Sequence, residues 1–158
     1  MPFYLLSLFF AVYGVDQYTD VGGEALCGVK TTAKDARAVY QTAIGLTVVY
    51  HSIEFMRMLA LAASALVGAN LIIPYYILSI NVLFGVIALV IALITRFGAD
   101  GSACATAQPG RATYLLVQIV PLILLLFSGF HVLLYMRVKG VEWCNQVINE
   151  ESEDEDDD

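Results

Sequence analysis

The two histidines of the chain lie in a phrase that is written twice. Tyr50–Arg57 reads YHSIEFMR and Phe130–Arg137 reads FHVLLYMR, with His51 and His131 each six residues before an Arg. If the two helices are equivalent, the histidines lie at matched depth, with both rings facing the bundle axis. Two imidazoles placed in this way on facing helices can ligate a b-type haem. A satisfied interior histidine is more common, and that is the interpretation we favour.

Glu54 adds a carboxylate to the first phrase. His51, Glu54 and Arg57 follow one another at intervals of three residues, which places them along one face of a helix. The structural interpretation is a Glu54–Arg57 pair near a membrane surface, with Arg57 reaching the interface. The functional one is a proton or ion path lined by His51 and Glu54. Leu134 replaces Glu54 in the second phrase, which ends in Arg137, so such a path would be asymmetric.

The cysteines fit a structural bond better than a metal or redox site. Cys27 and Cys104 each precede one of the phrases, a pattern that fits a disulfide in an oxidising lumen, with two free thiols as the alternative. Cys144 lies outside this pattern and is expected to stay reduced. The chain contains no P-loop, G-x-S-x-G, H-E-x-x-H or C-x-x-C motif. We therefore expect no metal site and favour a protein that is not an enzyme.

Charge is concentrated at the C-terminus. The chain has 158 residues, 59% of them hydrophobic, and a net charge of -7. Residues 150–158 hold eight of the fifteen acidic residues, so the rest of the chain is nearly neutral. A block of like charges repels itself, and we expect residues 148–158 to form a disordered tail. Ser152 in this tail is a candidate phosphorylation site. The few basic residues outside it do not indicate nucleic-acid binding.

Long apolar runs identify the elements that carry these residues. Leu71–Thr95 and Thr113–Met136 lack permanent charges, and a bilayer core needs about 20 apolar helical residues. Ala38–Val67 is a third candidate, interrupted by Glu54 and Arg57. Pro2–Val15 is a short fourth, without the basic start or the cleavage site of a signal peptide. The sequence therefore predicts an all-α integral membrane protein with four transmembrane helices.

Five short matches in the same order indicate an internal repeat. They are PFYLLSL with PYYILSI, YGV with FGV, Cys27 with Cys104, RAVY with RATY, and the two His phrases. Between matches, the second unit is longer by six residues on each arm, or about 9 Å of helix. We therefore predict two tandem helical hairpins related by a pseudo-two-fold axis, the second one taller. Their ranges are 1–66 and 74–147, joined by a turn at 67–73.

The orientation of the hairpins rests on opposing signals. The predicted tips carry five basic residues against three at the other end, which by a literal count places the tips in the cytoplasm. The cysteine pair and the acidic context of Ser152 favour the opposite orientation, with both termini cytosolic. We adopt this second orientation as an expectation.

Three functions fit this architecture. The preferred one is a non-enzymatic tetraspan protein in the lipid bilayer, acting as a structural, trafficking or accessory subunit beside a larger membrane protein or a second copy. The second is a transporter or channel that uses His51, Glu54 and Arg57. The third is an electron carrier with haem b between His51 and His131.

Overall fold

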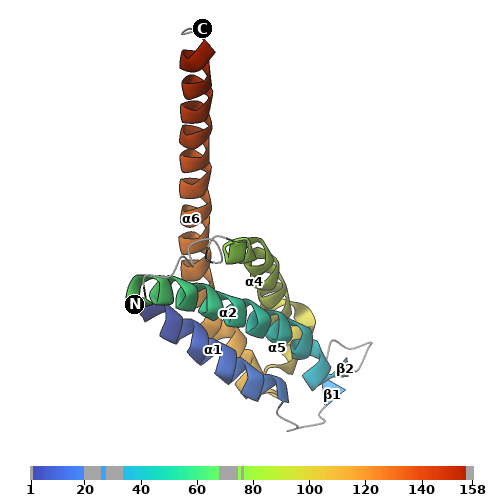
Figure 1. Ribbon diagram of the computed structural model, residues 1–158. Coiled ribbons are helices and arrows are strands. Elements are labelled where there is room, and N and C mark those ends of the chain that lie inside the picture. Colours follow the sequence, from blue (N-terminus) through green and yellow to red (C-terminus); the bar gives the residue numbers. More distant parts are fainter. Residues whose placement is uncertain (1, 20–25, 28–33, 68–74, 76, 156–158) are drawn as a thin grey trace.

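Four long helices form the body of the protein. The computed structural model describes residues 2–19, 26–27, 34–67, 75 and 77–155 (Figure 1). The long helices are α1 (Pro2–Thr19), α2 (Ala36–Val67), α4 (Asn81–Phe97) and α6 (Pro109–Glu155), and a short helix α5 (Ala99–Cys104) follows α4. The chain is thus almost entirely helical in its described part, as the sequence predicts.

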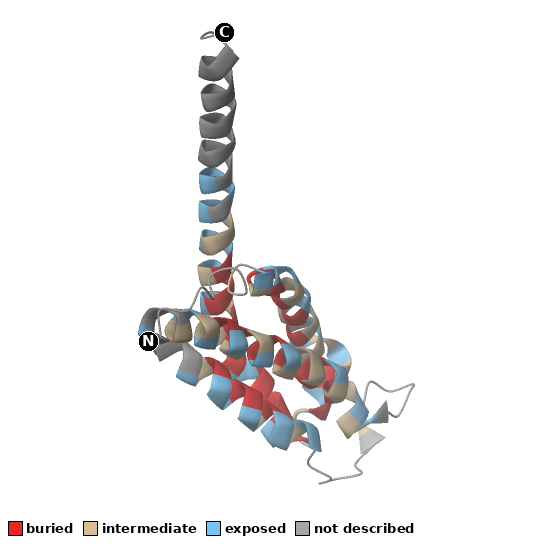
Figure 2. Ribbon diagram, viewed as in Figure 1, coloured by how far each residue is buried: buried red, intermediate tan, exposed pale blue. Residues whose placement is uncertain are grey.

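The long helices close into a ring. α1 packs against α2 and α6, and α4 packs against the same two helices from the other side. Helices that follow one another in the chain are therefore neighbours in space, and Figure 2 shows their buried residues turned towards the middle of the bundle. Two buried clusters fill the interior, one around Tyr40, Tyr114 and Leu115 and the other around Tyr50 and Leu122.

Two of these helices are long and apolar enough to cross a membrane. They are Arg37–Ala63 in α2 and Pro109–Lys139 in α6, whereas Asn81–Phe97 is apolar but shorter. Two of the four predicted spans therefore have the length and composition that a span requires.

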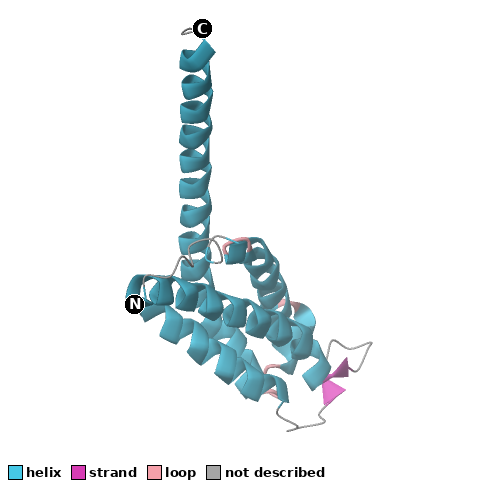
Figure 3. Cartoon of the chain, viewed as in Figure 1, coloured by secondary structure: helices cyan, strands magenta, loops and turns pink. Residues whose placement is uncertain are grey.

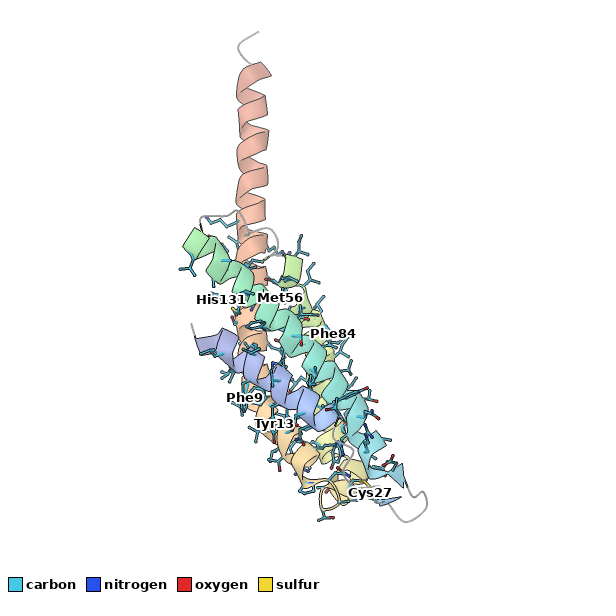
Figure 4. The ribbon with its side chains drawn as sticks, turned by 60° about the horizontal axis from the view of Figure 1, so that its bottom comes forward. Phe9, Tyr13, Cys27, Met56, Phe84 and His131 are labelled. Carbon is cyan, nitrogen blue, oxygen red and sulfur yellow. A yellow bond between two sulfur atoms is a disulfide. The ribbon has the colours of Figure 1, made fainter. Side chains whose placement is uncertain are left out.

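The surface of the bundle is apolar and its interior carries polar groups. Ile94 is 66% exposed and Phe127 is 72% exposed, while His51 and Gln118 are fully buried. Large apolar residues recur every three or four positions on the outer face of each long helix; examples are Leu5, Leu8, Val12, Val49, Met56, Leu83, Ile87, Val90, Leu116, Val120 and Leu124. Figure 4 shows the side chains standing out around the ribbon, with Phe9 and Met56 labelled among them. Proteins dissolved in water usually show the opposite distribution, with large apolar side chains in the interior and polar side chains on the surface.

A disulfide closes one end of the bundle. β1 (Leu26–Cys27) pairs antiparallel with β2 (Lys34–Asp35), which leads into α2; these strands are coloured magenta in Figure 3. Cys27 is bonded to Cys104 at the end of α5, with their Cα atoms 5.2 Å apart and 77 residues between them in sequence. The pairing inferred from one cysteine before each phrase is therefore present in the structure. It holds the α1–α2 connection and the α4–α6 connection at one end.

Two glycines allow the helices to approach closely. A Cβ on Gly14 would lie 2.5 Å from the Tyr114 hydroxyl, and one on Gly85 would collide with the ring of Tyr50. A larger residue at either position would push neighbouring helices apart. These glycines are equivalent in the predicted repeat, and both are buried.

The acidic tail differs from its predicted disorder. α6 continues without a break through Glu155, well beyond the bundle (Figure 1). Extending an existing helix needs no new nucleation, and glutamate is a good helix former. For residues 150–155 these factors prevail over the repulsion between carboxylates. Residues 156–158, and most of the predicted inter-repeat turn at 67–73, lie outside the described residues.

The disulfide predicts how many thiols of the chain react with a maleimide. Fully denatured, unreduced protein is expected to take up one polymer-tagged maleimide per chain, at Cys144, and three after reduction, because Cys27 and Cys104 are bonded. Gel mobility reads the number of tags. Three tags before reduction would contradict the pairing, and a Cys144→Ser variant, expected to take up none, is the control.

Candidate functional site

Polar side chains form a stripe along the inner face of α2. Tyr40, Thr47, His51, Glu54 and Arg57 are all at most 3% exposed. The intervals between them are seven, four, three and three residues, which keeps them on one helix face. From Tyr40 to Arg57 the stripe covers about 26 Å of helix axis, close to the thickness of a bilayer core of about 30 Å. Because all five side chains are buried, each polar group on the stripe must find its partner inside the bundle.

At the end of the stripe that lies farther from the disulfide, Glu54 and Arg57 form a buried ion pair. Arg57 Nε donates to Glu54 Oε1 at 3.0 Å, and Arg57 Nη2 pairs with the same oxygen. Arg57 Nη1 donates to the Tyr75 hydroxyl at 3.3 Å and to Ser79 Oγ at 3.4 Å. The guanidinium carbon also lies 5.2 Å from the centre of the Tyr75 ring. The pair therefore fastens α2 to the residues that lead into α4, which fits the structural interpretation.

Along α2, His51 lies between the Glu54–Arg57 pair and the disulfide end of the bundle. Its Nε2 is 3.4 Å from Gln118 Oε1 on α6. Because a carbonyl oxygen only accepts, this contact is a hydrogen bond when Nε2 carries a proton. The ring stacks on Phe10 of α1 with centroids 5.4 Å apart, and Tyr50 lies edge-on at 5.4 Å. The imidazole is thus held between α1, α2 and α6.

Tyrosine hydroxyls join the helices nearer the disulfide. Tyr114 on α6 donates to the backbone oxygen of Phe10 on α1 at 3.1 Å and lies 3.3 Å from Thr47 Oγ1 on α2. Tyr40 donates to the backbone oxygen of Gly101 in α5. Tyr40 and Tyr114 are equivalent in the predicted repeat, and each donates a hydrogen bond to the backbone of the other predicted hairpin.

An arginine completes the disulfide end. Arg111, only 1% exposed, donates from Nε to the backbone oxygen of Gln17 at 2.8 Å and from Nη1 to Gln108 Oε1. It therefore fastens the start of α6 to the end of α1. The two ends of the bundle are both tied by an arginine, Arg57 at one and Arg111 at the other.

Asn81 brings a further polar group to the level of His51. Its Nδ2 donates to the backbone oxygen of Tyr50 at 3.2 Å, across the α2–α4 contact. Asn81 also borders a groove of about 320 Å³ between these helices, and the other residues along this groove are apolar: Val49, Ile53, Ile77, Leu78, Ile80 and Phe84.

The prediction that both histidines face the bundle axis at matched depth is wrong. His51 is buried, but His131 is exposed, and Figure 4 shows His131 and Cys27 towards opposite ends of the bundle. The residue at the level of His51 is Gln118, which lies 13 residues, or about 20 Å of helix, before His131. The disulfide aligns the hairpins at their tips, so the extra length of the second appears at the far end. The structure therefore gives no support to haem ligation by this pair.

The two arginines of the repeated phrases differ in burial as the two histidines do. Arg57 is buried in its ion pair, whereas Arg137 is exposed on α6. Ser152 falls within α6, in the part whose side chains lie outside the description. Among the described residues, no group of three or more His, Cys, Asp or Glu is placed to hold a metal ion.

Several buried polar residues were not among the predicted site residues. They are Ser7, Tyr40, Thr47, Ser79, Asn81, Gln108, Arg111, Tyr114 and Gln118. The available signal was a polar residue isolated within an apolar run: Gln118 is the only amide between residues 113 and 136. In a membrane-embedded helix such a residue points inward by default.

No known protein family, curated protein or solved structure matches the chain. Its function must therefore be inferred from the arrangement of these polar residues.

The buried ion pair leads to a prediction about stability. Glu54→Leu alone is expected to cost about 3–5 kcal/mol of unfolding free energy, because it leaves the Arg57 guanidinium buried without its carboxylate. The double substitution Glu54→Leu/Arg57→Met is expected to cost less than this single one. Thermal unfolding in a mild detergent measures both.

A matched control is available in the second phrase. Arg137→Ala removes an exposed arginine from the equivalent sequence position and is expected to change stability by no more than about 0.5 kcal/mol. If the double variant is less stable than Glu54→Leu, the view that the unpaired charge is the costly element is wrong.

Proposed function

We propose that the protein is a multi-pass membrane protein with four spans, acting without catalysis as a structural, trafficking or accessory subunit of a membrane assembly. Its disulfide-bonded tips lie in an oxidising compartment and both termini lie in the cytosol. The partner is a larger membrane protein or a second copy of the chain.

The observation that carries this proposal is the apolar exterior around a polar interior. Exposed Leu, Ile, Val and Phe cover the outer faces of α1, α2, α4 and α6, while Ser7, His51, Glu54 and Gln118 are buried. A bilayer is the solvent in which such a surface is stable, and every helix that carries it then contacts lipid.

The lengths of the shorter helices support four spans. α1 has 18 residues and α4 has 17, or about 26 Å of helix each, which is close to the hydrocarbon thickness of a bilayer. The residues leading into α4 from Tyr75 add to its length. The repeat is supported at Ser7 with Ser79, Gly14 with Gly85, and Tyr40 with Tyr114, since both members of each pair are buried.

The ties at both ends support a rigid accessory body rather than a moving transporter. The disulfide and Arg111 hold one end, and the Glu54–Arg57 pair with Tyr75 and Ser79 holds the other. Relative sliding of α2, α4 and α6 would have to break several of these contacts together. The cysteine bond also supports placing the tips in an oxidising compartment.

Glycosylation mapping tests this topology. Acceptor sites placed singly in residues 20–25, at 105–107, in 68–74 and after 158 are expected to be glycosylated in microsomes at the first two positions only. Two spans formed by α2 and α6 alone would place 20–25 and 105–107 on opposite sides. That result would overturn the four-span arrangement.

A second candidate function is the passage of protons or small ions along the α2 stripe. The observation in its favour is the sequence of buried polar groups from Tyr40 to Arg57, which covers nearly the depth of a bilayer core. Purified protein in liposomes would then dissipate a pH gradient, His51→Leu would stop this, and His131→Ala would leave it unchanged. A wild-type protein that does not dissipate the gradient removes this candidate.

A further inference from the structure

One side of α6 carries a series of residues at alternating intervals of three and four. The series is Val117, Val120, Leu124, Phe127, His131, Leu134 and Val138, and all seven are exposed. It lies on the outer face of the helix, because Leu125 and Leu126 beside it are buried in the bundle. Intervals of three and four that alternate over several turns are the pattern of a coiled-coil seam.

The series continues where α6 leaves the bundle (Figure 1). Val141, Asn145 and Ile148 stand at its next three positions, in a stretch whose backbone is helical through Glu155. A lipid-facing helix needs apolar residues only over the hydrocarbon thickness, so contact with lipid does not account for the series beyond Arg137. We name the following residues the α6 seam: Phe127, His131, Leu134, Val138, Val141, Asn145 and Ile148.

The residue types along the α6 seam fit two strands. Val138 and Asn145 take the a positions of a heptad repeat, and Leu134, Val141 and Ile148 take the d positions. In parallel coiled coils, a β-branched residue at a with Leu at d favours a dimer, and a single Asn at an a position fixes the register and the number of strands. The α6 seam therefore favours two parallel helices in register.

Charge complementarity identifies the second helix. Arg137 precedes an a position and Glu142 follows a d position, so they hold the g and e positions that flank the α6 seam. Five residues apart on one helix, they do not face each other. In two parallel copies in register, each g position faces the following e position of the other helix, which places Arg137 of each copy opposite Glu142 of the other. A second copy of the chain therefore supplies both the apolar and the charged complement.

The other apolar line along this part of α6 lacks such a pair. It consists of Met136, Gly140, Trp143 and Val147. Heptad positions counted on that line place Lys139 at g and Cys144 at e, so they bring no opposite charges together between two copies. Gly140 has no side chain to fill the contact. The comparison favours the α6 seam.

We propose that a second copy of the chain docks along the α6 seam, forming a parallel two-stranded coiled coil at the end of the bundle away from the disulfide. Two copies in one membrane have the same orientation, so their α6 helices run parallel. The inference rests on the proposed function in requiring that α6 spans the membrane, and it decides for a second copy as the partner. Beyond Ile148 the next a and d positions are Ser152 and Glu155, where repulsion between two acidic tails ends the pairing.

Disulfide trapping locates the contact in the full-length chain. Cys144→Ser removes the one cysteine outside the disulfide. In this background, Val141→Cys and Ile148→Cys each place a thiol on the α6 seam, while Trp143→Cys and Val147→Cys are matched controls from the other line. The proteins are reconstituted in liposomes at a low ratio of protein to lipid and treated with a mild oxidant. Because a disulfide needs Cβ atoms about 4 Å apart, the seam variants are expected to form covalent dimers and the controls to stay monomeric.

Exchange of the flanking charges tests the register. Arg137→Glu and Glu142→Arg each place like charges opposite one another in both symmetry-related pairs, and each is expected to weaken self-association about five- to thirtyfold. The double variant Arg137→Glu/Glu142→Arg restores opposite charges and is expected to associate within about threefold of the unmodified chain. Gln146→Glu adds a charge at a position away from the α6 seam and is expected to leave association unchanged. Energy transfer between copies labelled at the C-terminus measures the association.

Two results would overturn the proposal. One is covalent dimers that form as well at Trp143→Cys and Val147→Cys as at the seam positions, or at none of the four. The other is a double charge variant that associates no better than Arg137→Glu alone. Glycosylation mapping reads the spans without reference to self-association, so a failure of the proposed function is distinguished from a failure of the α6 seam.

Discussion

A polar side chain enclosed by apolar helix surfaces has no solvent to bond with, and this constraint determines how the four helices are placed. Arg57 bonds to Glu54, Tyr75 and Ser79; Tyr114 bonds to the backbone of Phe10; Arg111 bonds to the backbone of Gln17. Apart from the Arg57–Glu54 pair, which lies within α2, each of these contacts fixes the axial position of one segment against another, which apolar packing alone does less specifically. Leu and Val elsewhere on the inner faces fill the remaining volume.

The ion pair, the disulfide and the helices could be predicted from residue spacing in the sequence. The Glu54–Arg57 pair follows from an interval of three residues. The Cys27–Cys104 bond follows from one cysteine before each repeated phrase, although the sequence left free thiols as the alternative. The helical class follows from the long apolar runs, and the charge-free run Thr113–Met136 lies in the apolar part of α6. The other long apolar helix, α2, comes from the run that Glu54 and Arg57 interrupt. For the ion pair and the helices the information lies within one element, and for the disulfide it lies in the repeat, which places one cysteine in each half of the chain.

Placement of one helix along another was not predictable in the same way. The spacing showed that the second hairpin is longer, but not which end takes up the difference. Because the tips are bonded together, His131 lies beyond the level of His51, and Gln118 takes the position that repeat symmetry had assigned to a histidine. The helical course of residues 150–155 was missed for another reason. Composition reports charge repulsion, but not the helix that already precedes it.

The connectivity of the disulfide has a consequence for the order of events during synthesis. Cys104 is made 77 residues after Cys27, when α1, α2 and α4 have all been synthesised. The first pair of helices must therefore associate, or be held, without a covalent tie until α5 has reached the same compartment. A chain that stops before Cys104 carries an unbonded Cys27 thiol at its first tip. That thiol can exchange with other thiols and disulfides until Cys104 is available to pair with it.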